Sequence, residues 1–253
     1  MSMKLKTIVA FLDRELRIGD FEDASHNGLQ VENSGSVSRV CCGVDASLEF
    51  FEAAARKDAD LLVCHHGLSW NDSLKRISGL NYRRLKFLLN HDMALYACHL
   101  PLDAHPRCGN NILIARALKL QRLAPFGLYN GREIGFAGRL PKPMRYTTLK
   151  RRIAEVMGRE VQTMDFGKKT VQSVAVISGG AAAEIEEAGR AGIDVYVSGE
   201  PALIAYSLAQ EYGLNAVFAG HYATEVWGVR ALGGMLAKRF GVEAEFVDLK
   251  ISF

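Results

Sequence analysis

One helix–strand pattern occurs twice in this chain of 253 residues, and that repeat limits the possible folds more than any other feature. Arg56 and Asp60, which precede an apolar run, correspond to Arg190 and Asp194 at an offset of 134 residues. Helix–strand patterns match by chance in many α/β chains. The agreement of the arginine and the aspartate favours a duplication over chance.

The repeat continues into a second block. The segment that ends at His99 corresponds to the segment that ends at His221 at an offset of 122 residues. The difference of 12 residues fits an insertion around 69–80. In both halves an acid follows four residues after the histidine, namely Asp103 and Glu225. We therefore predict two similar α/β lobes, residues 1–126 and 127–253, with a metal cleft between them and a C-terminal segment able to cross back to the first lobe.

Short apolar runs alternate with helical stretches along the whole chain, which is typical of α/β proteins with a largely buried sheet. The residues at 1–20 have helical spacing and predict a first helix, not a signal peptide. The further predicted helices span 48–57, 82–90 and 110–120, and the predicted strands span 39–44, 60–64, 93–98, 173–177 and 215–219. A Gly/Pro-containing stretch at 125–143 is the nearest approach to a linker.

The composition is that of an ordinary globular protein, 49% hydrophobic and 23% charged. A net charge of +3 without a basic run gives little support for nucleic-acid binding. No apolar stretch approaches the roughly 20 residues of a membrane span. The five cysteines form no CxxC pair, which predicts free thiols in a reducing cytoplasm. Secreted, membrane, collagen-like and disordered classes are excluded.

Candidate metal ligands stand where predicted strands end or helices begin. They are His65, His66, Asp103, His221 and Glu225. Each alone has an ordinary structural explanation, such as a packed histidine, a loop aspartate or an exposed helix pair. Together, three imidazoles and two carboxylates suit two ions about 3.5–4 Å apart. Nitrogen and oxygen ligands without thiolate favour Zn²⁺, Mn²⁺, Fe²⁺ or Ni²⁺.

Other signatures of catalysis are absent from the sequence. It contains no GxxxxGK[ST], HExxH or GxSxG motif. The small residues at 179–183 follow a predicted strand and could cradle a phosphate. A tight turn between strand and helix is the better interpretation of that segment.

Four sequence blocks resemble the NIF3 family, also called DUF34 or GTP cyclohydrolase 1 type 2 homolog, in its short bacterial form. The blocks are NGLQVE at 27–32, VCHHG at 63–67, HLPLDAHP at 99–106 followed by GNN at 109–111, and GHYATE at 220–225. They occur in the family's order over nearly the whole chain. One departure is His26, where many relatives carry an acidic residue.

The resemblance implies a dinuclear metal site whose five ligand positions match the candidates named above. Glu225 would bridge the ions, with His65 and Asp103 on one ion and His66 and His221 on the other. The resemblance also implies a homohexameric toroid, a trimer of dimers with the metal sites opening into its central cavity.

Two further histidines are candidate catalytic residues. His99 and His105 lie beside the site in sequence. We expect them to support the ligands or to face a substrate.

Two metal ions in such a site indicate hydrolysis by metal-activated water. The leading hypothesis is a cyclohydrolase-like enzyme acting on a nucleotide-like or other small heterocyclic or phosphorylated substrate, with a preference for anions. The alternative is a metal-binding oligomeric scaffold or regulatory protein without turnover. The lack of cysteine ligands counts against a structural zinc site. A ring that threads nucleic acid has little support from the charge.

Overall fold

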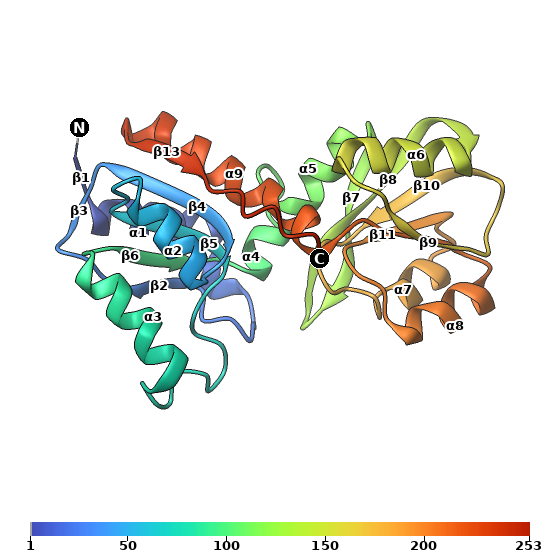
Figure 1. Ribbon diagram of the computed structural model, residues 1–253. Helices are drawn as coiled ribbons and strands as arrows, with labels where there is room; N and C mark the ends of the chain where they lie inside the picture. The colour runs from blue at the N-terminus through green and yellow to red at the C-terminus, as the bar shows by residue number, and fades with distance from the viewer. Residues whose placement is uncertain (1) are drawn as a thin grey trace. The chain divides into compact units, whose positions relative to one another are not determined.

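Two large β-sheets, each with helices on both faces, organise residues 2–253, which are the residues that the computed structural model describes (Figure 1). Contacts divide the chain into two units. Unit 1 comprises the residues up to Leu102 together with Gly228–Lys250, and unit 2 comprises Asp103–Trp227 and Ile251–Phe253. The predicted α/β class with two sheet-containing lobes is therefore confirmed. The boundary at 126 and 127, which concerns separately folding domains, stays a prediction.

The sheet of unit 1 has the strand order β13-β4-β5-β6-β2. Its three inner strands run parallel, β13 is parallel to β4, and β2 closes the other edge antiparallel to β6. The strands are β2 Gly28–Val31, β4 Arg39–Asp45, β5 Leu61–His66, β6 Ala94–Ala97 and β13 Glu243–Phe246, beside a small antiparallel pair of β1 Met3–Lys4 and β3 Ser36–Val37.

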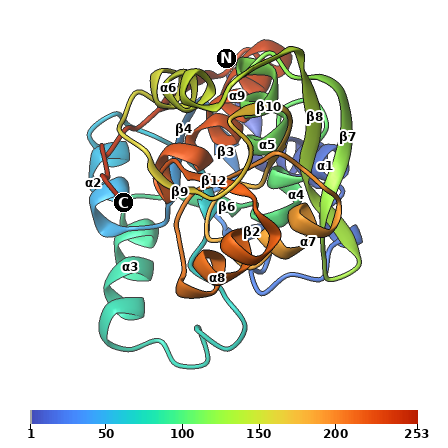
Figure 2. The same ribbon diagram turned by 90° about the vertical axis from the view of Figure 1, so that its right-hand side faces the viewer.

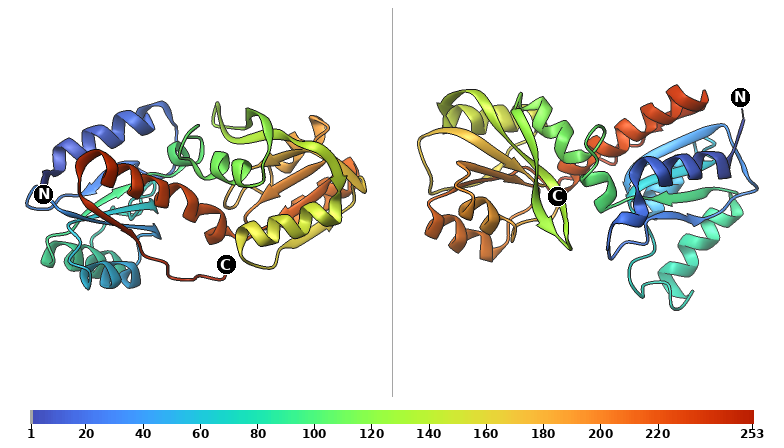
Figure 3. Two further views of the ribbon diagram at one scale, coloured as in Figure 1. Left: turned by 90° about the horizontal axis from the view of Figure 1, so that it is seen from above. Right: turned by 180° about the vertical axis from the view of Figure 1, so that it is seen from behind.

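Helices cover both faces of this sheet. The apolar side chains of α2 and α3 pack with one face in a single buried cluster. On the other face, Phe11 of α1 meets Phe240 of α9 with ring centroids 5.4 Å apart, and Figure 3 shows these helices side by side. The helices are α1 Leu5–Leu16, the short 3₁₀ helix η1 Ile18–Asp20, α2 Leu48–Ala55, α3 Gly79–Asn90, α4 Leu100–Asp103 and α9 His221–Phe240. Helices α4 and α9 pass from one unit into the other.

The sheet of unit 2 has the order β7-β8-β10-β11-β12-β9, again with three parallel strands and an antiparallel edge strand, β9. Helices α5 and α6 pack on one face, and Figure 1 shows α7 and α8 on the other. The strands are β7 Gln121–Tyr129, β8 Arg132–Arg145, β9 Gln162–Asp165, β10 Thr170–Val176, β11 Val195–Ser198 and β12 Asn215–Phe218. The helices are α5 Asn110–Ala117, α6 Tyr146–Met157, α7 Ile185–Arg190 and α8 Leu203–Tyr212.

The internal repeat is visible in the strand register. Val40 of β4 faces Leu61 of β5, and Val174 of β10 faces Val195 of β11, which is the offset of 134 residues found in the sequence. The predicted duplication therefore holds at the level of residue pairing.

The second offset was wrong by one residue. Leu61 pairs with Ala94 in β6 while Val195 pairs with Asn215 in β12, which gives 121 instead of 122. At that offset His221 matches Leu100, and these two residues begin α9 and α4. His99 and His221 are thus not equivalent, because matching histidines in sequence overrode the backbone register.

The stretch at 125–143 is not linker-like, since it lies within the long β7–β8 hairpin that Figure 2 shows at the edge of the sheet. Asn130 and Gly131, at φ of 46° and 76°, form its turn. Asn-Gly is the common sequence of a two-residue hairpin turn with two positive φ angles. That signal was present in the sequence.

The described residues include no helix that is both long and apolar enough for a membrane crossing.

Candidate metal centre

In unit 1, His65 and His66 are the last two residues of β5, and the strand continues through both of them. We expected them beyond the strand end. Their ring centroids nevertheless lie 4.8 Å apart. His99, just after β6, joins them at 5.1 Å from His65 and 5.6 Å from His66. One ligand atom from each of the three histidines falls within 4.8 Å of the others, so this group alone could hold a metal ion.

Each of these imidazoles is oriented by a hydrogen bond at Nδ1. The Nδ1 of His65 donates to the Cys98 carbonyl at 2.9 Å, and that of His66 donates to the Asp45 carboxylate at 2.7 Å. Carbonyl and carboxylate oxygens only accept, so a neutral ring keeps its lone pair on Nε2. Metal-binding histidines usually have such an arrangement behind them.

His99 is held in the same way by Asp23, at 2.9 Å from Nδ1. The Asp23 side chain is 2% exposed. Burial by itself would raise its pKa, but the hydrogen bond and charge of His99, with the Asn27 amide and the Ser25 backbone N–H, lower the pKa to about 2. Asp23 is therefore a carboxylate that fixes the His99 ring.

The NGLQ block at 27–30 supports this group. Asn27 accepts a hydrogen bond from the His99 backbone N–H at 2.7 Å and donates to Asp23 at 2.9 Å. Gln30 accepts from the Leu68 backbone N–H at 2.7 Å and so holds the loop that follows β5. His26 pairs through its ring with Ser69 of the same loop. The block thus positions the histidines from outside.

In unit 2, Asp103 is buried and its Oδ1 accepts two hydrogen bonds. Asn110 donates from Nδ2 at 2.8 Å and Ser178 donates from Oγ at 2.7 Å. The Ser178 backbone N–H in turn donates to Asn111 at 2.7 Å. These contacts hold the Asp103 carboxylate in one orientation.

His221 and Glu225 share one face of the first turn of α9. The His221 Nε2 lies 3.1 Å from Oε1 of Glu225, and its Nδ1 lies 3.3 Å from Oε1 of Glu200. Glu225 is buried at 2% exposure. The predicted i,i+4 pair is therefore a close contact in the structure.

Gly179, next to Ser178, makes room for this pair. A Cβ at this position would come 2.3 Å from Oε1 of Glu225 and 3.3 Å from Nε2 of His221. Its φ of +66° also favours glycine. The Ser178–Gly179 turn thus contacts Asp103 on one side and the His221–Glu225 pair on the other. This role fits the interpretation of 179–183 as a tight turn, since α7 begins only at Ile185.

His105 is placed differently. Its Nδ1 accepts from the backbone N–H groups of Arg107 at 3.2 Å and Cys108 at 3.1 Å. These bonds stabilise the turn at 105–108. A role for His105 towards substrate stays a prediction.

Sequence reasoning missed the carboxylates behind the histidines. Asp45 ends β4 opposite His66 in the parallel register, a position that a strand-end search in the first half could have found. Asp23 and Glu200 had no such signal, because their roles depend on loops that approach from elsewhere in each unit.

The donors fit a divalent metal. They are imidazole nitrogens and carboxylate oxygens, which suit Zn²⁺, Mn²⁺, Fe²⁺ or Ni²⁺. Cys64 precedes His65 but is fully buried, and burial raises its thiol pKa well above the usual value. A protonated, buried thiol is not a metal ligand.

Comparisons with known proteins agree over the whole chain. The family model described as Duf34/NIF3 (NGG1p interacting factor 3) matches residues 3–252. A protein of Archaeoglobus fulgidus named "GTP cyclohydrolase 1 type 2 homolog" is 43% identical over 247 residues, covering 98% of each chain. A protein of Deinococcus radiodurans with the same name is 42% identical over 241 residues, covering 95% of this chain and 91% of its own.

A solved structure of similar fold is that of the protein TTHA1606 from Thermus thermophilus. It is 36% identical and superposes with a TM-score of 0.90, covering 99% of this chain and 100% of its own.

Proposed function

Because this chain belongs to the Duf34/NIF3 family, we propose that it is a dinuclear metal-dependent hydrolase acting on a small nucleotide-like, heterocyclic or phosphorylated compound. The proposal rests on the family and on the donor groups found in each unit by itself. It is supported most by one observation, namely that Nδ1 of both His65 and His66 is engaged by an acceptor. Rings held in this way present Nε2 as the ligand atom.

The ligands in this proposal are the five residues of the family's pattern. His65 and His66 come from unit 1, and Asp103, His221 and Glu225 come from unit 2. Glu225, a buried carboxylate beside His221, is the candidate bridge. Bound divalent ions would lower the pKa of a water molecule and stabilise negative charge on the group that it attacks.

The remaining residues orient these ligands and handle protons. Asp45 and Glu200 lie against the Nδ1 atoms of His66 and His221. His99, fixed by Asp23 beside His65, is the candidate proton carrier. A histidine oriented by a carboxylate is a common general acid or base.

The test is the metal content of protein purified without an affinity tag, measured by elemental mass spectrometry. We expect about two ions per chain, with a loss in His65→Ala and in Glu225→Ala. His91→Ala, which removes an exposed histidine of unit 1, is the control and keeps the metal. Metal-loaded protein is then screened against nucleotides and their heterocyclic and phosphate ester analogues.

The outcomes separate the hypotheses. Turnover that disappears in both ligand variants supports the hydrolase. Metal loss without any change in a measurable activity means that the metal does not serve catalysis, and the scaffold or regulatory function then takes its place. A chain that binds no added Zn²⁺, Mn²⁺ or Fe²⁺ contradicts the ligand assignment.

We also propose that the chain forms the hexameric ring that the family resemblance implies. Support comes from α8, where Leu203 is 88% exposed and Ile204 and Tyr206 are about half exposed. Adjacent exposed apolar side chains often mark a protein interface. A reducing cytoplasm, expected from the five buried free cysteines, belongs to the same proposal.

A further inference from the structure

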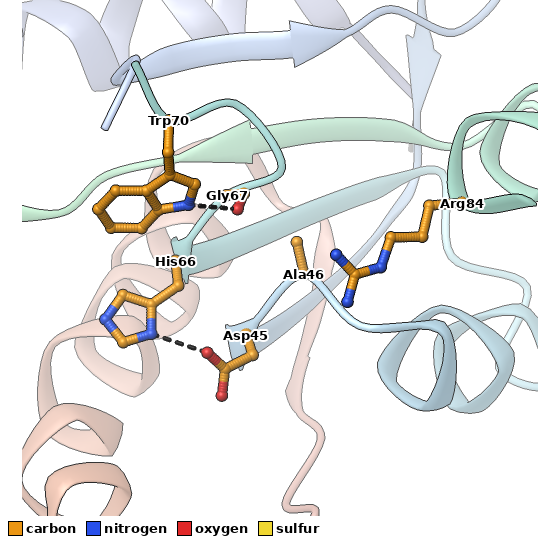
Figure 4. A pocket seen from close by; sticks show the side chains of 6 residues that line it. All are labelled: Asp45, Ala46, His66, Gly67, Trp70 and Arg84. Carbon is orange, nitrogen blue, oxygen red and sulfur yellow. Dashed lines mark hydrogen bonds and ion pairs between the residues drawn. The ribbon is translucent and has the colours of Figure 1, made fainter. Parts of the chain in front are cut away.

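A pocket of about 330 Å³ opens beside His66 within unit 1. Asp45, Ala46, His66, Gly67, Trp70 and Arg84 line it, and Figure 4 shows their side chains. Small-molecule sites in proteins are usually clefts of roughly 300–1,000 Å³. The pocket is therefore large enough for part of a small ligand, and it shares His66 with the candidate metal site.

Arg84 supplies a charge that the protein does not neutralise. It lies on α3, and its Nε is a buried atom without a hydrogen-bond partner among residues 2–253. No ion pair of Arg84 occurs among those residues either. Leaving a buried donor without an acceptor costs about 1–3 kcal/mol. An acceptor from outside the chain would remove this cost.

Asp45 does not serve as that acceptor, although it lines the same pocket. Its Oδ1 accepts from Nδ1 of His66 at 2.7 Å. In Figure 4 this carboxylate turns towards His66, while the guanidinium of Arg84 points into the pocket from the opposite side. The pocket therefore has one cationic side whose planar group suits an oxyanion, since guanidinium pairs with phosphate through two parallel hydrogen bonds.

Trp70 forms a rigid wall of the pocket. Its indole N–H donates to the Gly67 carbonyl at 2.8 Å. Its ring packs edge-on against His99, with centroids 4.9 Å apart, and is tilted against His66 at 5.7 Å. A fixed aromatic ring beside a cationic group suits a ligand that has a planar ring and an anionic group.

We propose that this pocket binds the phosphoryl group of the substrate on Arg84, with a planar ring of the substrate against Trp70. The inference rests on the proposed hydrolase function and narrows its substrates to phosphorylated ring compounds. Arg84 then acts as a binding residue that holds the substrate next to His66, while the reacting bond lies at the metal ligands.

The experiment uses the fluorescence of Trp70 as the readout. The chain contains two tryptophans, so the full-length Trp227→Phe variant leaves Trp70 as the single emitter. This protein is titrated, both metal-loaded and after treatment with a chelator, with a nucleoside 5′-monophosphate, the matching nucleoside and inorganic phosphate. The same titrations are repeated with Arg84→Gln and Arg84→Lys, and with Arg83→Gln, which changes an exposed arginine of the same helix.

The expected result is saturable binding of the monophosphate that is stronger than that of the nucleoside. Arg84→Gln raises its Kd at least about tenfold, Arg84→Lys raises it less, and Arg83→Gln leaves it unchanged. Unfolding midpoints of the variants show whether each of them is folded. Seen in the chelator-treated protein, this pattern supports the pocket even where the metal measurements reject a hydrolase.

Three results overturn the inference. They are equal affinity for nucleoside and monophosphate, binding that Arg84→Gln does not weaken, and no binding by any form of the protein. Phosphate binding that needs metal and ignores Arg84 places the anion at the ions, which overturns the pocket and leaves the proposed hydrolase intact.

Discussion

Asp60 and Asp194 make the same two hydrogen bonds in the two units of this chain. Oδ2 of Asp60 accepts from the backbone N–H groups of Ser38 and Arg39, at 2.6 and 2.9 Å. Oδ2 of Asp194 accepts from those of Gln172 and Ser173, at 2.9 and 3.0 Å. All three positions shift by 134 residues, so one carboxylate joins the start of the first parallel strand to the start of the second in each unit.

The first prediction concerns the pH dependence of stability through Asp194. Burial alone would raise its pKa, but the Lys168 hydrogen bond and the two backbone N–H groups lower it from 3.8 to about 2. A group with a lowered pKa stabilises the fold above its unfolded pKa and loses this effect as the pH falls through the folded pKa. Asp194→Asn should therefore cost about 1–2 kcal/mol near pH 7, with a smaller cost near pH 2.

Urea unfolding of both proteins at the two pH values measures this difference. Asp58→Asn, at a side chain that is 93% exposed, serves as the control and should change little. A cost of Asp194→Asn that stays constant from pH 7 to pH 2 would contradict the prediction.

The second prediction concerns Gly179. In Gly179→Ala the new Cβ meets Oε1 of Glu225 at 2.3 Å, so the carboxylate must move and metal binding should be lost. Gly192 has the same φ of +66° with nothing within 4 Å of a Cβ. Gly192→Ala therefore reports the backbone strain alone, about 1 kcal/mol. Elemental analysis should find metal in Gly192→Ala and little in Gly179→Ala, and equal metal in both would exclude the displacement of Glu225.

The third prediction concerns the carboxylate behind His66. Asp45→Asn keeps the side-chain shape but removes the charge that holds the imidazole, which should weaken metal binding by about 10–100-fold. Competition with a chelator of known affinity measures the change. Asp72→Asn, an exposed substitution in the same unit, is the control. An unchanged affinity in Asp45→Asn would mean that the contact of His66 with Asp45 is structural only.

The fourth prediction concerns the apolar surface of α8. Leu203→Glu places a charge at a side chain that is 88% exposed, and it should lower the oligomeric mass measured by light scattering, because a charge is costly in a buried interface. Leu128→Glu, at a side chain of the same unit that is 62% exposed, is the matched control. A Leu203→Glu protein with the wild-type mass would show that α8 lies outside the interface.

The strands and helices around the candidate site could be predicted from local pattern. The apolar runs at 39–44 and 93–98 are β4 and β6, and the stretch at 110–120 contains α5. Each of these elements buries one face or both, so its hydrophobic period is visible within a few residues. The hairpin at 121–145 was missed, because its Gly and Pro residues resemble those of a loop while its pairing partner lies in the next strand.

The sequence by itself determined the α/β class, the duplication and the set of imidazoles and carboxylates, because residue type, hydrophobic period and spacing are local properties. Only the tertiary structure decided which atoms these groups present. The lone pair of His65 lies on Nε2 because Cys98, 33 residues away, accepts from Nδ1. The Asp23 pKa is lowered because His99 folds against it, and Arg84 is left without an acceptor because Asp45 bonds to His66 instead. Hydrogen bonding and burial depend on which distant segments meet, and that pairing is settled only when the strands take their register.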